Sequence, residues 1–140
     1  MFEKVLLSVD GSEHALHAAR IAADLARAMN SKDFRIVVAY DFIPPYLGEP
    51  NMQSAINARL EEAKAIVKKA MDAVGQIPCE IYTELIEGSP AEVIIQVAAI
   101  RKSYVFVMGS RGLGTLAGLL LGSTSQKVVA HAPCPVLIVR

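Results

Sequence analysis

The glycine-rich run from Gly109 to Ser125 carries the clearest chemical signal in the sequence, and it reads GSRGLGTLAGLLLGSTS. Glycines that follow a buried strand let main-chain N–H groups approach an anion closely. A helix that opens at the end of the run offers free N–H groups and a dipole that favours phosphate. Arg111 adds a fixed positive charge, and Ser123 and Thr124 add hydroxyl donors. The run therefore predicts that its two halves bind one polyphosphate from two sides. The alternative is a flexible loop in which the glycines cap helices.

Two better-known phosphate motifs do not describe this run. The chain contains no Gly-Lys-Ser/Thr, so the run is not a P-loop. The dinucleotide fingerprint also fails, because no cluster of glycines follows the first apolar segment. The spacing of Gly109, Gly112 and Gly122 is therefore a different pattern.

Asp10 is the second candidate, because it directly follows the apolar segment Val5–Val9. An Asp between a strand and Gly-Ser can serve a ligand, or it can organise the turn and cap the next helix. A phosphoacceptor role, as in response-regulator receivers, needs an acidic pair here and a lysine after the fourth strand. Asp10 stands alone, and Gly109-Ser110 occupies the later position, so we reject the receiver interpretation.

Histidines and cysteines give weaker signals. His14 and His17 are three residues apart on an expected helix, but no third metal ligand is near, so we expect a solvated face. Cys79 and Cys134 are far apart in sequence and cannot form a disulfide framework. No electropositive surrounding is evident for Cys134, so we expect an unreactive thiol.

The elements that must position these residues alternate between strands and helices. We expect strands at Val5–Val9, Phe34–Tyr40, Cys79–Ile86, Tyr104–Met108 and Pro135–Val139. We expect helices from Glu13 to about Asn30, at Asn51–Val74, from Pro90 to about Ile100, and at Thr124–His131. This alternation predicts an α/β fold, a single open parallel five-stranded sheet with helices on both faces. Ligands of such sheets bind at the carboxyl ends of the strands, and the long Asp41–Pro50 connection there is a candidate functional loop.

Composition excludes several other classes of protein. The 140 residues fit one domain, residues 1–140, and 53% of them are hydrophobic, enough for a sizeable core. Lys+Arg and Asp+Glu each total 14, so the chain lacks the basic excess expected for binding nucleic acid. We expect no membrane segment, because the longest uncharged run, Gly112–Gln126, is too short to span a bilayer. With no export signal and two cysteines, we expect a cytoplasmic protein.

Three segments together resemble the universal stress protein family: VLLSVDGSEHA, EGSPAEVII and MGSRGLGTLAGLLLGSTSQKVVAHAPCPVLIV. The last segment matches the nucleotide motif of the ATP-binding branch, Gly-two-Gly-nine-Gly-Ser/Thr, at Gly109, Gly112, Gly122 and Ser123. The resemblance covers essentially the whole chain. It implies a Rossmann-like fold of the adenine nucleotide alpha hydrolase type, with strand order 3-2-1-4-5.

The resemblance also implies a role for individual residues. The acid that ends the first strand, Asp10, would hold the ribose hydroxyls, with Ser8 and Val9 lining the same turn. Tyr40 at the end of the second strand would contact adenine, and Met108 would flank the base or ribose. The phosphates would be held by Gly109, Ser110, Arg111, Gly112, Leu113, Gly114, Thr115, Gly122, Ser123 and Thr124.

The residues of the expected site favour an ATP-binding regulatory module over an enzyme. Hydrolysis needs a group that positions the nucleophile, and Asp10 is the only acid at the expected site. The alternatives are a slow ATPase or phosphoryl-transfer enzyme, and a dimerisation scaffold with an idle nucleotide site. The resemblance implies ATP loaded with Mg or Mn, without a protein metal ligand that can be named. It also implies a homodimer through the last strand, Pro135–Val139. Without a partner, the open main-chain groups of this edge would be prone to aggregation.

Overall fold

The computed structural model describes residues 3–42, 45–101, 104–111 and 121–140. Its centre is a parallel five-stranded sheet, with strands in the order β3-β2-β1-β4-β5. The strands are β1 (Lys4–Ser8), β2 (Asp33–Tyr40), β3 (Ile81–Glu87), β4 (Val105–Gly109) and β5 (Val136–Val139). The predicted fold class and strand order are therefore confirmed, and the predicted strand ends lie within two residues of the observed ones.

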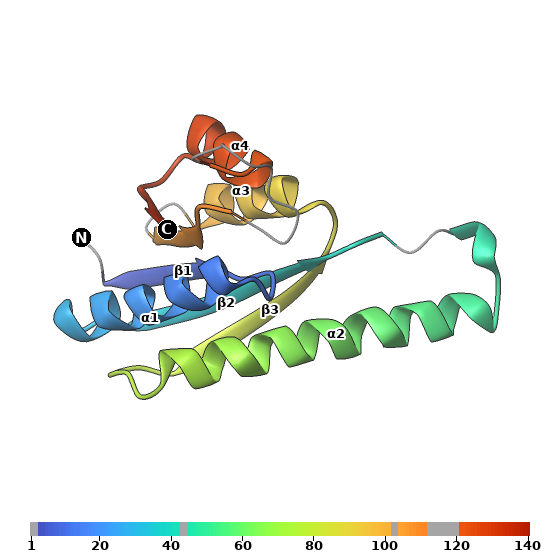
Figure 1. Ribbon diagram of the computed structural model, residues 1–140, viewed down its shortest axis with the longest axis horizontal. Coiled ribbons are helices and arrows are strands. Elements are labelled where there is room, and N and C mark those ends of the chain that lie inside the picture. The colour runs from blue at the N-terminus through green and yellow to red at the C-terminus, as the bar shows by residue number, and fades with distance from the viewer. Residues whose placement is uncertain (1–2, 43–44, 102–103, 112–120) are drawn as a thin grey trace.

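Helices cover both faces of the sheet (Figure 1). They are α1 (Glu13–Ala28), α2 (Asn51–Val74), α3 (Pro90–Ile100) and α4 (Ser123–His131), and a short 3-10 helix, η1 (Pro45–Leu47), lies in the connection before α2. Helices α1 and α2 lie on one face, and α3 and α4 lie on the other. The ends of α2 are those predicted from sequence, since Gly75 terminates it with a positive φ of 68°.

Each face of the sheet has its own apolar core. On the α1/α2 face, Phe34 and Ile36 of β2 pack with the helices, and every buried residue of α1 is an alanine. On the α3/α4 face, Leu6 and Phe106 are fully buried against α3 and α4. Alanines have little side-chain volume, so α1 approaches the sheet closely.

The strand order reverses between β1 and β4 at the middle of the sheet. From β1 the chain moves outward through β2 to β3, and it then returns to β4 on the other side of β1. Such a reversal leaves a crevice at the carboxyl ends of the two central strands. Ser8 and Gly109 end those strands, so the segments after them lie beside this crevice.

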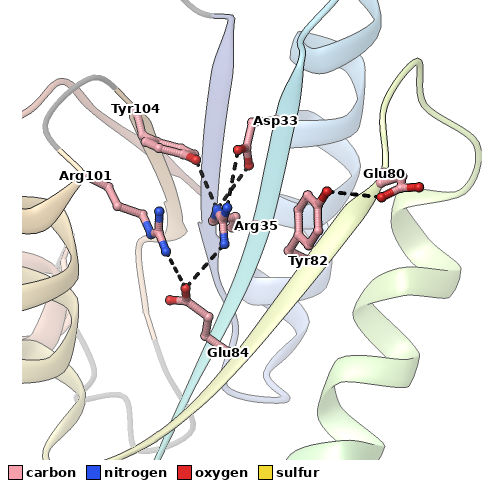
Figure 2. Close-up of polar contacts among 7 residues, drawn as sticks. All are labelled: Asp33, Arg35, Glu80, Tyr82, Glu84, Arg101 and Tyr104. Carbon is pink, nitrogen blue, oxygen red and sulfur yellow. Dashed lines mark hydrogen bonds and ion pairs between the residues drawn. The ribbon is translucent and has the colours of Figure 1, made fainter.

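A polar network occupies the opposite end of the sheet, where the strands begin (Figure 2). Arg35 of β2 donates a hydrogen bond from Nε to Tyr104 Oη at 3.0 Å, and its guanidinium also pairs with Asp33 and Glu84. Arg101, which ends α3, lies 2.7 Å from the same Glu84 carboxylate oxygen. The hydrogen bond to Tyr104 raises the pKa of Arg35, and burial raises the pKa of the Tyr104 phenol. Through Arg101, this network links the end of α3 to β2 and β3.

Candidate functional site

Two adjoining cavities open at the carboxyl end of the sheet. Both are lined by Asp10, Ala39, Pro90 and Thr124, which makes them parts of one site. The smaller cavity lies against the ends of β1 and β4 and is also lined by Val9, Ile94 and Met108. The larger cavity has a volume of about 430 Å³ and extends to α2 and to the start of α4. Its size is within the range of small-molecule sites.

Asp10 has two roles in this geometry. Its Oδ1 accepts a hydrogen bond from the main-chain N–H of Ser12 at 2.9 Å, which organises the turn after β1. Ser12 in turn caps α1, because its Oγ accepts from the Ala15 N–H at 3.1 Å. Within the described residues, Oδ2 of Asp10 makes no hydrogen bond, and the side chain lines both cavities. The carboxylate can therefore hold the turn with one oxygen and a ligand hydroxyl with the other.

The end of β4 is tied directly to the start of α4. The Gly122 N–H donates to the Ser110 carbonyl oxygen at 2.7 Å. The buried Ser125 hydroxyl lies 2.9 Å from the Gly109 carbonyl oxygen and 3.1 Å from that of Ser110. These bonds hold the two halves of the glycine-rich run against each other.

The first turn of α4 offers hydrogen-bond donors to the larger cavity. Gly122 is the N-cap, and Ser123, Thr124 and Ser125 follow it as lining residues. The N–H groups of a first helical turn have no partner inside the helix, and the dipole adds positive potential there. The N-cap residue, Gly122, has no side chain with which to cap these groups. This end of α4 can therefore bind an anion such as phosphate.

Gly109 makes a close contact that its role in the glycine motif did not predict. A Cβ added there would lie 2.9 Å from the main-chain carbonyl carbon of His14. The glycine therefore lets α1 pack against the end of β4. His14 is half-buried, and its Nδ1 lies 3.4 Å from Ser110 Oγ. The expectation of a solvated face is wrong for His14, because the close packing at Gly109 draws this part of α1 onto the strand.

The structure brings most of the predicted site residues together. The smaller cavity is lined by Ser8, Val9, Asp10, Met108, Gly109, Arg111 and Thr124. The larger cavity is lined by Asp10, Tyr40, Gly122, Ser123 and Thr124. Ser110 is buried and lines neither cavity, because its main chain bonds to α4 and to Val139 of β5. Gly112, Leu113, Gly114 and Thr115 lie outside the described residues.

Sequence reasoning missed lining residues on three elements, β2, α3 and α2. Ala39, one residue before Tyr40, lines both cavities, and so does Pro90, which we interpreted only as the first residue of α3. Helix α2 adds Arg59, Glu62, Ala63 and Ile66 to the larger cavity. Their spacing of three, four and seven residues places them on one face of a helix, a signal that the sequence did contain.

Additional acids at the larger cavity correct a second expectation. Asp41 and Glu62 line it together with Asp10, so Asp10 is not the only acid at the site. The larger cavity is also lined by the cationic Arg59, and the smaller cavity by Arg111.

The remaining chemistry-bearing residues lie apart from the cavities. Burial raises the pKa of the Cys79 and Cys134 thiols, which disfavours the reactive thiolate. His17 Nδ1 contacts the main-chain oxygen of Arg140. The described part of the chain contains no group of three His, Cys, Asp or Glu side chains arranged to hold a metal ion. Over the same residues, no helix has the length and apolar character needed to cross a membrane.

A doubly wound parallel sheet with the start of a helix at its switch point is the architecture of the Rossmann-like α/β proteins. The pattern of the Universal stress protein family matches residues 1–140. The chain is 48% identical over 140 residues to a universal stress protein from Thermus aquaticus, encoded in the 3′ region of a QAH/OAS sulfhydrylase gene. The match covers the full length of both proteins. The chain belongs to the universal stress protein family.

Solved structures agree with this assignment. The universal stress protein UspA from Lactobacillus plantarum is 25% identical, with a TM-score of 0.83 over 98% of this chain and 97% of that chain. A universal stress protein in complex with cAMP is 28% identical, with a TM-score of 0.67 over 98% of this chain and 96% of that chain.

Proposed function

We propose that this protein is a regulatory module that binds ATP in the two cavities at the carboxyl end of the sheet. The observation that carries the proposal is that Asp10 and the open first turn of α4 line the same cavity. One supplies an acceptor for hydroxyl groups, and the other supplies donors for phosphate. The 28% identical universal stress protein in complex with cAMP, an adenine nucleotide, supports this ligand class.

Each part of the nucleotide has a place in the proposal. The base lies across the two cavities, against Tyr40 at the end of β2 and against the apolar side chains of Val9 and Met108. The ribose hydroxyls bond to Asp10, and the phosphates lie at Ser123 and Thr124. Tyr40 and Ala39 line the wall formed by the end of β2. Arg111 is the cation of the smaller cavity and reaches the phosphate nearest the ribose.

A divalent ion, Mg or Mn, fits this proposal as a companion of the phosphates. Mg²⁺ is commonly bound through substrate phosphates and one or two carboxylates, and it retains several waters. Asp41 supplies a carboxylate on the wall of the larger cavity, which Asp10 also lines. The ion would reduce repulsion between the phosphates and these acids.

The first test is the nucleotide content of freshly purified protein, followed by titration with ATP. We expect micromolar binding, which corresponds to about 8 kcal/mol. Asp10→Asn keeps an acceptor for the Ser12 N–H but weakens the bond to the ribose, so the dissociation constant should rise at least about tenfold. Asp24→Asn, an exposed carboxylate on the outer side of α1, is the matched control. A wild-type protein that binds no ATP at millimolar concentration would contradict the proposal.

Slow ATP hydrolysis is a second candidate, which the acids of the larger cavity favour. Asp41 and Glu62 add carboxylates that could position a water, so turnover does not depend on Asp10 alone. A timed assay of phosphate release tests this activity. If hydrolysis occurs, Asp41→Asn should slow turnover while ATP still binds. Bound ATP that stays intact for hours would favour the regulatory module.

We also propose that the protein forms a homodimer through β5 and the preceding Pro135. This strand is an edge of the sheet, and Leu137 on it is 39% exposed. Pairing with a second copy would satisfy the open main-chain groups of the edge. Light scattering should give twice the 15.0 kDa chain mass, and Leu137→Lys should shift the protein towards the monomer. A wild-type monomer at micromolar concentration would contradict this proposal.

A further inference from the structure

The N-terminal half of α2 extends beyond the carboxyl end of the sheet (Figure 1). All of the buried side chains of this helix, Ala63, Val67, Ala70 and Val74, lie in its C-terminal half. At the junction, Ala63 and Ile66 lie on the wall of the larger cavity, and the charged residues Arg59 and Glu62 continue that wall outward. The helix therefore places two charges at the mouth of the site.

Arg59 is placed to meet an anion at this mouth. It is the one basic side chain among the described residues that line the larger cavity, and it shares that lining with Ser123 and Thr124 of α4. Its side chain is 44% exposed, which is consistent with a position at the opening. An anion in the larger cavity would therefore have the first turn of α4 on one side and a guanidinium on another. A guanidinium is well suited to phosphate oxygens because it presents several donors in one plane.

Glu62 opposes this role of Arg59. Its Oε2 lies 3.5 Å from Arg59 Nη1, as an ion pair between positions i and i+3 of the helix. The carboxylate lines the same cavity, so it competes with a phosphate for the guanidinium and repels negative charge. The pair is exposed and contributes little to stability, so exchanging Glu62 for a phosphate as the partner has a small cost.

We propose that Arg59 and Glu62 set the preference of the site for the number of phosphates. Arg59 binds the outer phosphates of a nucleoside triphosphate, and Glu62 limits that binding. This inference rests on the proposed nucleotide site. It goes further by assigning the discrimination between ATP and AMP to α2, rather than to the glycine-rich run alone. AMP lacks the outer phosphates, so its affinity does not depend on either side chain.

Helix α2 offers a closely matched control pair. Glu61 and Lys64 form another exposed ion pair between positions i and i+3, at 3.6 Å, and neither residue lines the larger cavity. We would titrate ATP and AMP into the wild type and into four variants, Arg59→Gln, Glu62→Gln, Lys64→Gln and Glu61→Gln. Calorimetry gives the dissociation constants, and circular dichroism checks that α2 keeps its helical content.

The two cavity variants should change ATP affinity in opposite directions. Arg59→Gln should weaken ATP about tenfold, the usual effect of losing one charge-assisted hydrogen bond. Glu62→Gln should strengthen ATP about threefold by removing a repelling charge. AMP should change less than about twofold in both, and the Lys64 and Glu61 variants should leave both nucleotides unchanged. The ATP preference of the wild type should also fall with added salt, because exposed charges are screened.

Four outcomes would overturn the inference. Equal losses of ATP and AMP in Arg59→Gln would mean that Arg59 contacts the nucleoside or supports the helix. An equal effect of Lys64→Gln would mean that net charge, rather than position, controls affinity. Unchanged ATP binding in Arg59→Gln, with a wild type that binds ATP, would overturn the inference and leave the proposed function standing. A wild type that binds neither nucleotide would overturn both.

Discussion

At the amino end of the strands, the charged groups have protein partners. Arg35 contacts Asp33, Glu84 and Tyr104, and Arg101 shares Glu84 with it (Figure 2). At the carboxyl end, the polar groups face cavities. Among the residues that the structure describes, one oxygen of Asp10 and the first-turn N–H groups of α4 are open to a ligand, and Arg59 has only an exposed ion pair. Ion pairs therefore hold the amino end of the sheet together, whereas the carboxyl end has groups that can bind a charged ligand.

The difference between the two ends follows from what each end must do. Partly buried ion pairs in a network resist rearrangement, because the removal of one partner leaves another charge uncompensated. Groups that bind a ligand must instead lack strong internal partners, so their desolvation is compensated only by the ligand. We infer that the amino end contributes to stability and the carboxyl end to binding. Substitutions at the two ends should therefore separate these properties.

Gly109→Ala should have the largest effect, because Gly109 packs closely against α1 and also lines the candidate site at the carboxyl end of the sheet. The added Cβ would lie 2.9 Å from main-chain and side-chain carbons of His14, and main chain cannot move aside cheaply. We expect a loss of about 2–3 kcal/mol in the free energy of unfolding, measured by urea denaturation. Gly75→Ala is the control, since nothing lies within 4 Å of an added carbon and only the positive φ of 68° is strained. Equal losses at the two glycines would contradict the close-contact explanation.

Glu84→Ala should disrupt the ion-pair network at the amino end of the sheet without affecting nucleotide binding at the carboxyl end. The carboxylate is 25% exposed and pairs with both Arg35 and Arg101, so its removal leaves two guanidinium groups without their shared partner. We expect a loss of about 1–2 kcal/mol in unfolding free energy and unchanged ATP affinity. Asp24→Ala removes an exposed partner of Arg27 and should cost less than about 0.5 kcal/mol. A large change in ATP affinity for Glu84→Ala would show that the two ends are coupled.

Tyr104→Phe should have the smallest effect, and its size should depend on pH. Burial raises the pKa of this phenol above its ordinary value of 10.0. The unfolded chain then loses the phenolic proton more readily than the folded chain, so the folded state loses stability as the pH rises above about 10. At pH 8 the variant should lose about 1 kcal/mol with the hydrogen bond to Arg35. Between pH 8 and 10.5, its stability should decrease less than that of the wild type, and an equal decrease would contradict this role for Tyr104.

Local signals in the sequence predicted the helices and strands well, and the family resemblance supplied the strand order. Asn51–Val74 was predicted to the residue, because Gly75 is a strong helix stop and an apolar stripe runs along the helix. The start of α3 was also predicted, from Ser89 and Pro90. Strand ends were less certain, since the last residue of a strand depends on pairing with its neighbours.

Contacts between distant elements could not be predicted in this way. Gly109 was assigned to phosphate from its spacing, whereas the structure shows that a side chain there would collide with His14, far away in the sequence. Arg59 was absent from the predicted site because its position depends on how far α2 extends past the sheet. The network around Arg35 joins residues from several elements, and nothing in the local sequence of any one of them indicates the others.

The tie between Ser110 and Gly122 also has a consequence for the order of folding. The candidate site combines the turn after β1, near the start of the chain, with the first turn of α4, near its end. A nascent chain therefore has no complete site until α4 has left the ribosome and β4 has paired with β1. A ligand bound there stabilises only the finished fold, by about 2.7 kcal/mol at a hundredfold excess over its dissociation constant. A bound nucleotide would thus add to the stability of the domain only after these distant elements have come together.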